Sequence, residues 1–129
     1  MDQMQTVPGP SQAAFNTLNN QVTKKTGTIT MESGFTSSLF IEKSANVVTV
    51  NGYISATNAF PNEATLVGNI ASGYRPTSYV RAVAAISSAA YEPGDTGYIT
   101  INTNGNVSIK AKAGNSYKAA YFSLSYCTT

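Results

Sequence analysis

Apolar and polar residues alternate in short runs through most of the chain after residue 27, and turn-forming residues separate the runs. The clearest example is the pair of runs at 98–102 and 106–111, which flank Asn104-Gly105. An Asn-Gly pair between alternating runs favours a type I′ turn with positive φ at both central positions, so the sequence predicts a β-hairpin here. The apolar positions of the hairpin are Ile99, Ile101, Val107 and Ile109.

The same alternation predicts strands along the rest of this region, each with one buried face. The expected strands are 27–31, 38–43, 46–56, 65–70, 78–87, 97–103, 106–112 and 120–127. Short strands separated by regular turns are typical of an all-β jelly-roll or Greek-key sandwich or barrel, here of about eight antiparallel strands. Gly52 lies inside the third strand and is expected to mark a bulge or a close approach of another backbone.

The pattern differs before residue 27, where apolar residues recur at spacings of three and four. This predicts a short N-terminal helix from Ser11 to about Lys25, ended by Gly27. So short a helix is marginal in water, so its apolar stripe must pack against another surface. That surface is either its own β domain or other copies of the helix around a threefold axis. We therefore divide the chain into a neck, residues 1–26, and a β head domain, residues 27–129. The apolar stripe consists of Phe15, Leu18 and Val22.

Composition narrows the possible functions. The 129 residues fit one domain. A net charge of +2, carried by scattered residues, is too weak for a nucleic-acid-binding surface. Serine, threonine, asparagine and glycine supply much of the polarity, which suits uncharged polar ligands such as sugars. No run of about 18 apolar residues is present, so we expect no membrane insertion. The amino terminus lacks the features of a secretory signal, so synthesis in a cytoplasm is expected.

Catalytic and metal-binding residues are scarce. Cys127 is the single cysteine and the chain has no histidine. An intramolecular disulfide and a cysteine zinc site are therefore excluded by count, and the usual general base is missing. Glu92 and Asp95 are the only acids close together, and the Pro-Gly pair between them is ordinary turn chemistry. Contact with a ligand and a glycosidase pair are the alternatives for these acids. We expect no enzyme activity, no metal and no cofactor.

Two other features could be structural or functional. Gly73-Tyr74-Arg75-Pro76 predicts a corner before the fifth strand, with positive φ at the glycine and Tyr74 as a plug. Phe60 and Tyr91 lie in predicted loops, where strand alternation does not explain them. Such rings either pack against the domain or cover the apolar face of a sugar whose hydroxyls are bound by planar polar side chains.

Several segments occur together in a characteristic order. They are Val48-Thr49-Val50-Asn51-Gly52-Tyr53-Ile54, Val67-Gly68-Asn69-Ile70, Gly73-Tyr74-Arg75-Pro76, Gly97-Tyr98-Ile99-Thr100-Ile101 with the Asn104-Gly105 turn, and Phe122-Ser123-Leu124-Ser125-Tyr126. In these segments the chain, from about residue 28 to 126, resembles the carboxy-terminal head domains of tailed-phage receptor-binding and baseplate proteins, particularly those that infect Gram-positive hosts. The resemblance implies a homotrimer, a β-barrel or jelly-roll head after a helical neck, and saccharide binding in crevices between protomers. Some relatives use Trp or His in that crevice, and this chain has neither.

The predicted function is therefore that of a phage receptor-binding protein head at the tail tip or baseplate of the virion, a non-catalytic homotrimer that attaches to host saccharide. Expected partners are a host cell-wall saccharide or teichoic-acid-like polymer and other phage baseplate or tail proteins, with no nucleic acid. The alternatives are a structural baseplate or decoration subunit and, disfavoured by the missing histidine, a wall-degrading enzyme. The predicted saccharide-binding residues are Tyr91, Glu92, Asp95, Tyr98, Arg81 (to neutralise a phosphate) and Phe60.

Overall fold

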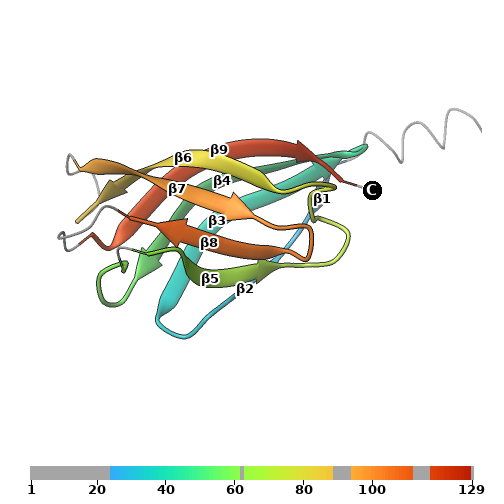
Figure 1. Ribbon diagram of the computed structural model, residues 1–129. Coiled ribbons are helices and arrows are strands. Elements are labelled where there is room, and N and C mark those ends of the chain that lie inside the picture. The colour runs from blue at the N-terminus through green and yellow to red at the C-terminus, as the bar shows by residue number, and fades with distance from the viewer. Residues whose placement is uncertain (1–23, 62, 89–93, 112–116, 129) are drawn as a thin grey trace, which may run out of the picture.

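The computed structural model describes residues 24–61, 63–88, 94–111 and 117–128. In these ranges every regular element is a β-strand, and all strands belong to one antiparallel sheet (Figure 1). The strands are β1 (Lys25–Thr26), β2 (Ile29–Met31), β3 (Phe35–Ser44), β4 (Val47–Ala56), β5 (Thr65–Ile70), β6 (Val80–Ser87), β7 (Asp95–Ile101), β8 (Asn106–Lys110) and β9 (Ala119–Cys127). Their order across the sheet is β1-β3-β4-β9-β6-β7-β8-β5-β2. The prediction of an all-β antiparallel fold is confirmed.

The sheet curls into a half-barrel because one segment, 25–31, lies at both of its margins (Figure 1). Its first part, β1, pairs with β3 and its second part, β2, pairs with β5. Between them, Gly27 N donates to Ile41 O at 2.7 Å, and Thr28 O accepts from Ala71 N at 3.0 Å. The concave side of the curl encloses the core.

The core is made of aliphatic side chains at alternate strand positions, as the sequence predicted. On β4 the buried residues Val48, Val50 and Ile54 lie at alternate positions, and on β6 Ala84 and Ile86 do. On β9 Phe122 and Tyr126 are buried while Ser123 and Ser125 are exposed. β-Branched residues dominate because they pack well on a pleated surface. The largest fully buried side chains are Ile41, Ile54, Ile70, Ile86, Ile99, Ile101, Ile109, Val48, Val50, Val67 and Val107.

Strand β1 was not predicted, and the end of the predicted helix is wrong. Lys25 and Thr26 are extended and pair with Lys43 and Glu42 of β3. The physical reason is tertiary: the margin of β3 offers backbone partners that the local helical pattern does not reveal. The rest of the predicted helix, including its apolar stripe, lies outside the described residues.

The β7–β8 hairpin is confirmed, but its turn is not type I′. Gly105 takes positive φ, 89°, whereas Asn104 does not. Gly105 N donates to Asn102 O at 2.9 Å, and Asn102 N donates to Asn106 O at 3.0 Å. This is a three-residue loop, in which a type I turn is followed by a glycine in the left-handed region. The side chain of Asn104 stabilises it by accepting from Asn106 N at 3.0 Å.

The segment from Ala71 to Pro76 forms the predicted corner. Gly73 has φ 91°, and the Tyr74 ring packs over Gly27, where an added Cβ would lie 2.7 Å from the ring. Arg75 Nε donates to Ile70 O at 2.8 Å, and its Nη2 donates to Asn69 Oδ1 at 2.9 Å. These contacts give Tyr74 and Arg75 a structural role in the corner.

Two hydrogen bonds join the end of β9 and the residue after it to the same corner. The hydroxyl of Tyr126 donates to Tyr74 O at 2.5 Å, and the hydroxyl of Thr128 donates to Arg75 O at 2.5 Å. Burial raises the pKa of the Tyr126 phenol to about 12, because the charged phenolate would lose its hydration.

Gly52 marks a close approach and not a bulge. Its φ is 136°, and an added Cβ would lie 2.1 Å from Ser38 O. The β3–β4 register runs unbroken past it, with Leu39 opposite. The register shift lies instead between Leu66 and Gly68 on β5.

Loop backbones meet at the end of the sheet opposite β1, which we call the distal end (Figure 1). Ala56 N donates to Lys118 O at 2.8 Å, Phe60 N donates to Tyr117 O at 2.8 Å, and Lys118 N donates to Ser87 O at 3.0 Å. The distal end thus joins the ends of β4 and β6 to the start of β9.

Candidate ligand-binding site

Two of the predicted site residues, Arg81 and Tyr98, come together on the outer face of β6, β7 and β8. Antiparallel pairing places Arg81 opposite Thr100 and Tyr98 opposite Lys110. Because Ile99 and Ile109 point into the core, the neighbouring positions on these strands point outward. The alternation that builds the core therefore also exposes this cluster.

The guanidinium of Arg81 is positioned by two aromatic side chains. Its Cζ lies 5.3 Å from the centroid of the Tyr98 ring, and its Nη2 donates to the Tyr79 hydroxyl at 3.3 Å. Tyr98 is 49% exposed and Tyr79 is 52% exposed, so the cluster is open to solvent. A cation over an exposed ring gains about 0.5–1 kcal/mol, enough to favour this orientation. The remaining N–H donors of Arg81 can bind a ligand.

These residues line a shallow pocket of about 90 Å³, which we call the Arg81 pocket. Two cationic side chains, Arg81 and Lys110, and two hydroxyl side chains, Thr100 and Ser108, face it, and none of its lining residues is acidic. A planar guanidinium favours bidentate binding of phosphate or carboxylate, while hydroxyls and a tyrosine ring suit a polyol or sugar. The pocket therefore suits a small anionic group attached to a polyol. Its lining is Ala64, Tyr79, Arg81, Tyr98, Thr100, Ser108 and Lys110.

The other predicted site residues do not join this pocket. Asp95 has the inward parity of β7 and lies three residues from Tyr98, and its Oδ1 accepts from Thr96 N at 2.9 Å. Phe60 is 3% exposed, and its ring stacks on Phe35 with centroids 5.9 Å apart. In this conformation Phe60 is a core residue, so the site proposed below omits it. Tyr91 and Glu92 lie outside the described residues.

Tyr79 and Lys110 belong to the pocket but were not predicted. Tyr79 is two residues before Arg81, so the period of a strand places both on one face. The β7–β8 hairpin predicts Lys110 as a member of the pocket if its loop has three residues, because that loop length places Lys110 opposite Tyr98. A two-residue loop shifts that register by one.

Across the described parts of the chain, no three His, Cys, Asp or Glu side chains are grouped so as to hold a metal ion. Among the same residues, no helix is long and apolar enough to cross a membrane. Cys127 is an exposed free thiol in β9.

Comparison with known proteins gives matches by structure alone. No protein-family model and no curated protein sequence matches the chain. The receptor binding protein gp15 of Listeria phage PSA superposes with a TM-score of 0.66 at 15% identity, over 93% of this chain and 74% of that one. The head domain of lactococcal phage bIL170, described among receptor binding domains, gives a TM-score of 0.61 at 19% identity, over 80% of this chain and 97% of that one.

At these identities the likeness establishes a shared fold. The chain has the fold of phage receptor-binding head domains, and the resemblance noted in its sequence is confirmed at that level.

Proposed function

We propose that this protein is the head of a phage receptor-binding protein and attaches the virion tail to a saccharide on the host cell surface without catalysing a reaction. The observation that supports this most directly is the head-domain fold shared with two phage receptor-binding proteins. The exposed Arg81 pocket, with aromatic, cationic and hydroxyl side chains, gives the proposal a chemical basis.

In this proposal the chain acts as a homotrimer. The neck, predicted as residues 1–26, joins the head to other tail or baseplate proteins, and because β1 pairs into the sheet we place its end before Lys25. The described head begins at β1, and the distal end lies at the other end of the sheet (Figure 1). A neck at the first end points the distal end away from the virion, and the Arg81 pocket lies on the outer face of the head, near the start of β6, and not at that end.

The ligand of the Arg81 pocket is proposed to be a phosphate-bearing wall polymer of the teichoic-acid type. Arg81 and Lys110 neutralise the phosphate, and Thr100 and Ser108 donate to neighbouring oxygens. Single contacts at so open a pocket are weak. Three heads on one trimer, and several trimers on one virion, would raise the affinity by high effective concentration.

The test is a pull-down and titration of the purified protein with cell walls from a panel of Gram-positive bacteria. We expect saturable binding to at least one wall. Arg81→Ala should weaken it about tenfold or more, because a charged hydrogen bond contributes about 1.5–3 kcal/mol. Lys25→Ala is the matched control, since it removes the same charge from an exposed position on β1.

Two outcomes would overturn the proposal. If the protein binds none of the walls saturably, the adhesin function is excluded. Stable docking to virion proteins in that case would favour a structural baseplate or decoration subunit. An equal loss in Lys25→Ala and Arg81→Ala would remove the Arg81 pocket as the site, because only overall charge would then matter.

A further inference from the structure

A second hollow lies on the outer face of the sheet, separated from β6 by the intervening strand β9. It is a groove of about 280 Å³ over β3 and β4, lined by Phe40, Glu42, Thr49 and Asn51. We call it the β3–β4 groove. Its volume is close to the lower end of the range for small-molecule sites, about 300–1,000 Å³.

Phe40 gives the groove an exposed aromatic face. Its neighbour Ile41 is buried and Leu39 packs against the core, so strand alternation forces Phe40 outward, where it is 69% exposed. Pairing places Asn51 directly opposite it, and Ser123 of β9 lies opposite Asn51. A large apolar ring thus stands in water beside small polar side chains.

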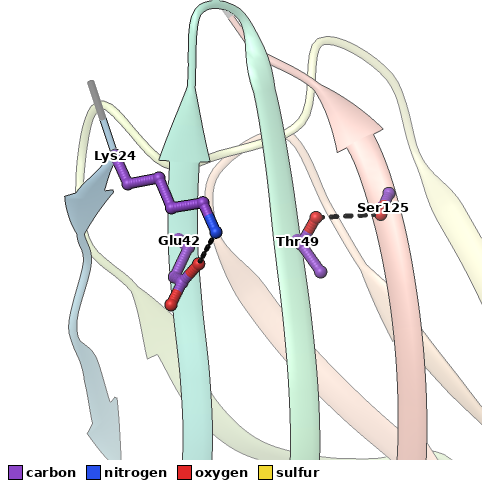
Figure 2. A network of polar contacts seen from close by, with 4 residues as sticks. All are labelled: Lys24, Glu42, Thr49 and Ser125. Atoms are coloured by element: carbon purple, nitrogen blue, oxygen red, sulfur yellow. Dashed lines mark hydrogen bonds and ion pairs between the residues drawn. The ribbon is translucent and has the colours of Figure 1, made fainter. Parts of the chain in front are cut away.

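Two polar side chains of the groove, Glu42 and Thr49, are held by partners outside it, as Figure 2 shows. Lys24 Nζ lies 3.5 Å from Glu42 Oε2, and the hydroxyls of Thr49 and Ser125 are 3.1 Å apart. Within the described residues, the Asn51 side chain makes no hydrogen bond. Its amide retains both donor and acceptor capacity for a ligand.

We propose that the β3–β4 groove binds an uncharged pyranose ring of the host saccharide, an inference that rests on the proposed function. The Phe40 ring covers the C–H face of the sugar, and Asn51 binds adjacent hydroxyls as donor and acceptor. The Glu42 carboxylate accepts from a further hydroxyl and disfavours a phosphate. The β3–β4 groove and the Arg81 pocket therefore select different parts of one polymer, a neutral ring and an anionic group.

The lining favours a sugar over a second copy of this chain. The cores of protein–protein interfaces are depleted in serine and glutamate, whereas the groove contains Glu42 and is bordered by Ser123 and Ser125. Hydroxyl, amide and carboxylate groups around one exposed ring are the usual composition of a site for a small polar ligand.

The test is a ¹⁵N–¹H NMR titration of the full chain with the methyl glycosides of glucose, galactose, rhamnose and N-acetylglucosamine, and with glycerol 3-phosphate. We expect at least one neutral glycoside to shift the backbone amides of Phe40, Glu42 and Asn51, and glycerol 3-phosphate not to shift them. Phe40→Ala should weaken that glycoside about tenfold, equivalent to about 1.4 kcal/mol.

Two further variants test whether the flat aromatic ring itself binds the sugar. One keeps an apolar side chain at position 40, and the other changes an exposed apolar residue elsewhere. Phe40→Leu keeps an apolar side chain but loses the flat face, and should recover only part of the affinity. Leu66→Ala alters another exposed apolar strand residue, 40% exposed, and should change nothing.

The inference is overturned if no neutral glycoside shifts these amides, or if Phe40→Ala binds as the parent does. It is also overturned if Phe40→Ala lowers the mass in solution by light scattering, since the ring then faces another copy. If the protein binds walls but no glycoside shifts the amides of the β3–β4 groove, this inference is wrong and the proposed function stands. A glycoside response without wall binding removes the adhesin function and leaves the groove as a sugar site.

Discussion

Replacing Gly52 by alanine tests whether the close approach of β3 and β4 determines the stability of the fold. The substitution has two costs. Backbone at φ 136° is nearly restricted to glycine, and strain of this kind costs about 1–3 kcal/mol. The new Cβ would also lie 2.1 Å from the carbonyl oxygen of Ser38, where ordinary contacts begin at 3.4 Å.

Relieving that contact requires β3 to move by about 1 Å within a register that is continuous from Phe35 to Ser44. We therefore expect Gly52→Ala to lose at least about 3 kcal/mol of unfolding free energy. A domain of this kind has about 5–15 kcal/mol in total, so the loss is large.

Gly34→Ala is the matched control. Gly34 also has positive φ, 91°, but an added Cβ there would meet nothing within 4 Å. It should lose only about 1–2 kcal/mol, from the left-handed backbone alone. Equilibrium urea unfolding at one fixed protein concentration measures both losses. Equal losses in the two variants would show that the contact with Ser38 costs nothing and would refute the argument.

Three further predictions concern the corner, the β3–β4 turn and alkaline pH. Arg75→Lys should lose about 1–2 kcal/mol in urea unfolding, because lysine cannot replace the planar fork that binds Ile70 O and Asn69 Oδ1; an unchanged midpoint would contradict this. Ala45→Gly should raise stability by about 0.5 kcal/mol, since Ala45 has φ 53° and glycine relieves that strain; a lower melting temperature would contradict it. The raised pKa of Tyr126, about 12 against 10 when unfolded, leaves stability unaffected below pH 10 and lowers it between pH 10 and 12, as the unfolded chain ionises first. Tyr126→Phe should show a smaller alkaline decline in chemical unfolding, and an identical decline would exclude this phenol as the cause.

The strands and their buried faces were predictable because period-two alternation is a local property of the sequence. The β7–β8 register was also within reach. Residues opposite each other in an antiparallel pair share a face, so placing Ile99 and Ile109 in one core requires a three-residue loop. The Asn-Gly pair, by contrast, favours a two-residue turn, which shifts the register by one and places Lys110 away from Tyr98.

The rest of the candidate site could not be predicted, because it depends on pairings between distant segments. Arg81 meets Tyr98 only through the β6–β7 register, and nothing in the local sequence specifies that register. Phe60 resembled a loop aromatic, but its ring stacks on Phe35. Phe40 lies in the continuous apolar run Leu39-Phe40-Ile41, where the sequence does not show which side chain faces outward.

The segment from Lys25 to Met31 also determines how the head carries mechanical load. A pull on Lys25 directed along β1 is parallel to the axis of β3, with which β1 pairs. The backbone bonds of that pair are therefore loaded in shear and share the force, where a perpendicular pull would break them one after another. Force that passes this pair reaches β5 through β2, so a head tethered by its amino-terminal end takes the strain at both margins of the sheet.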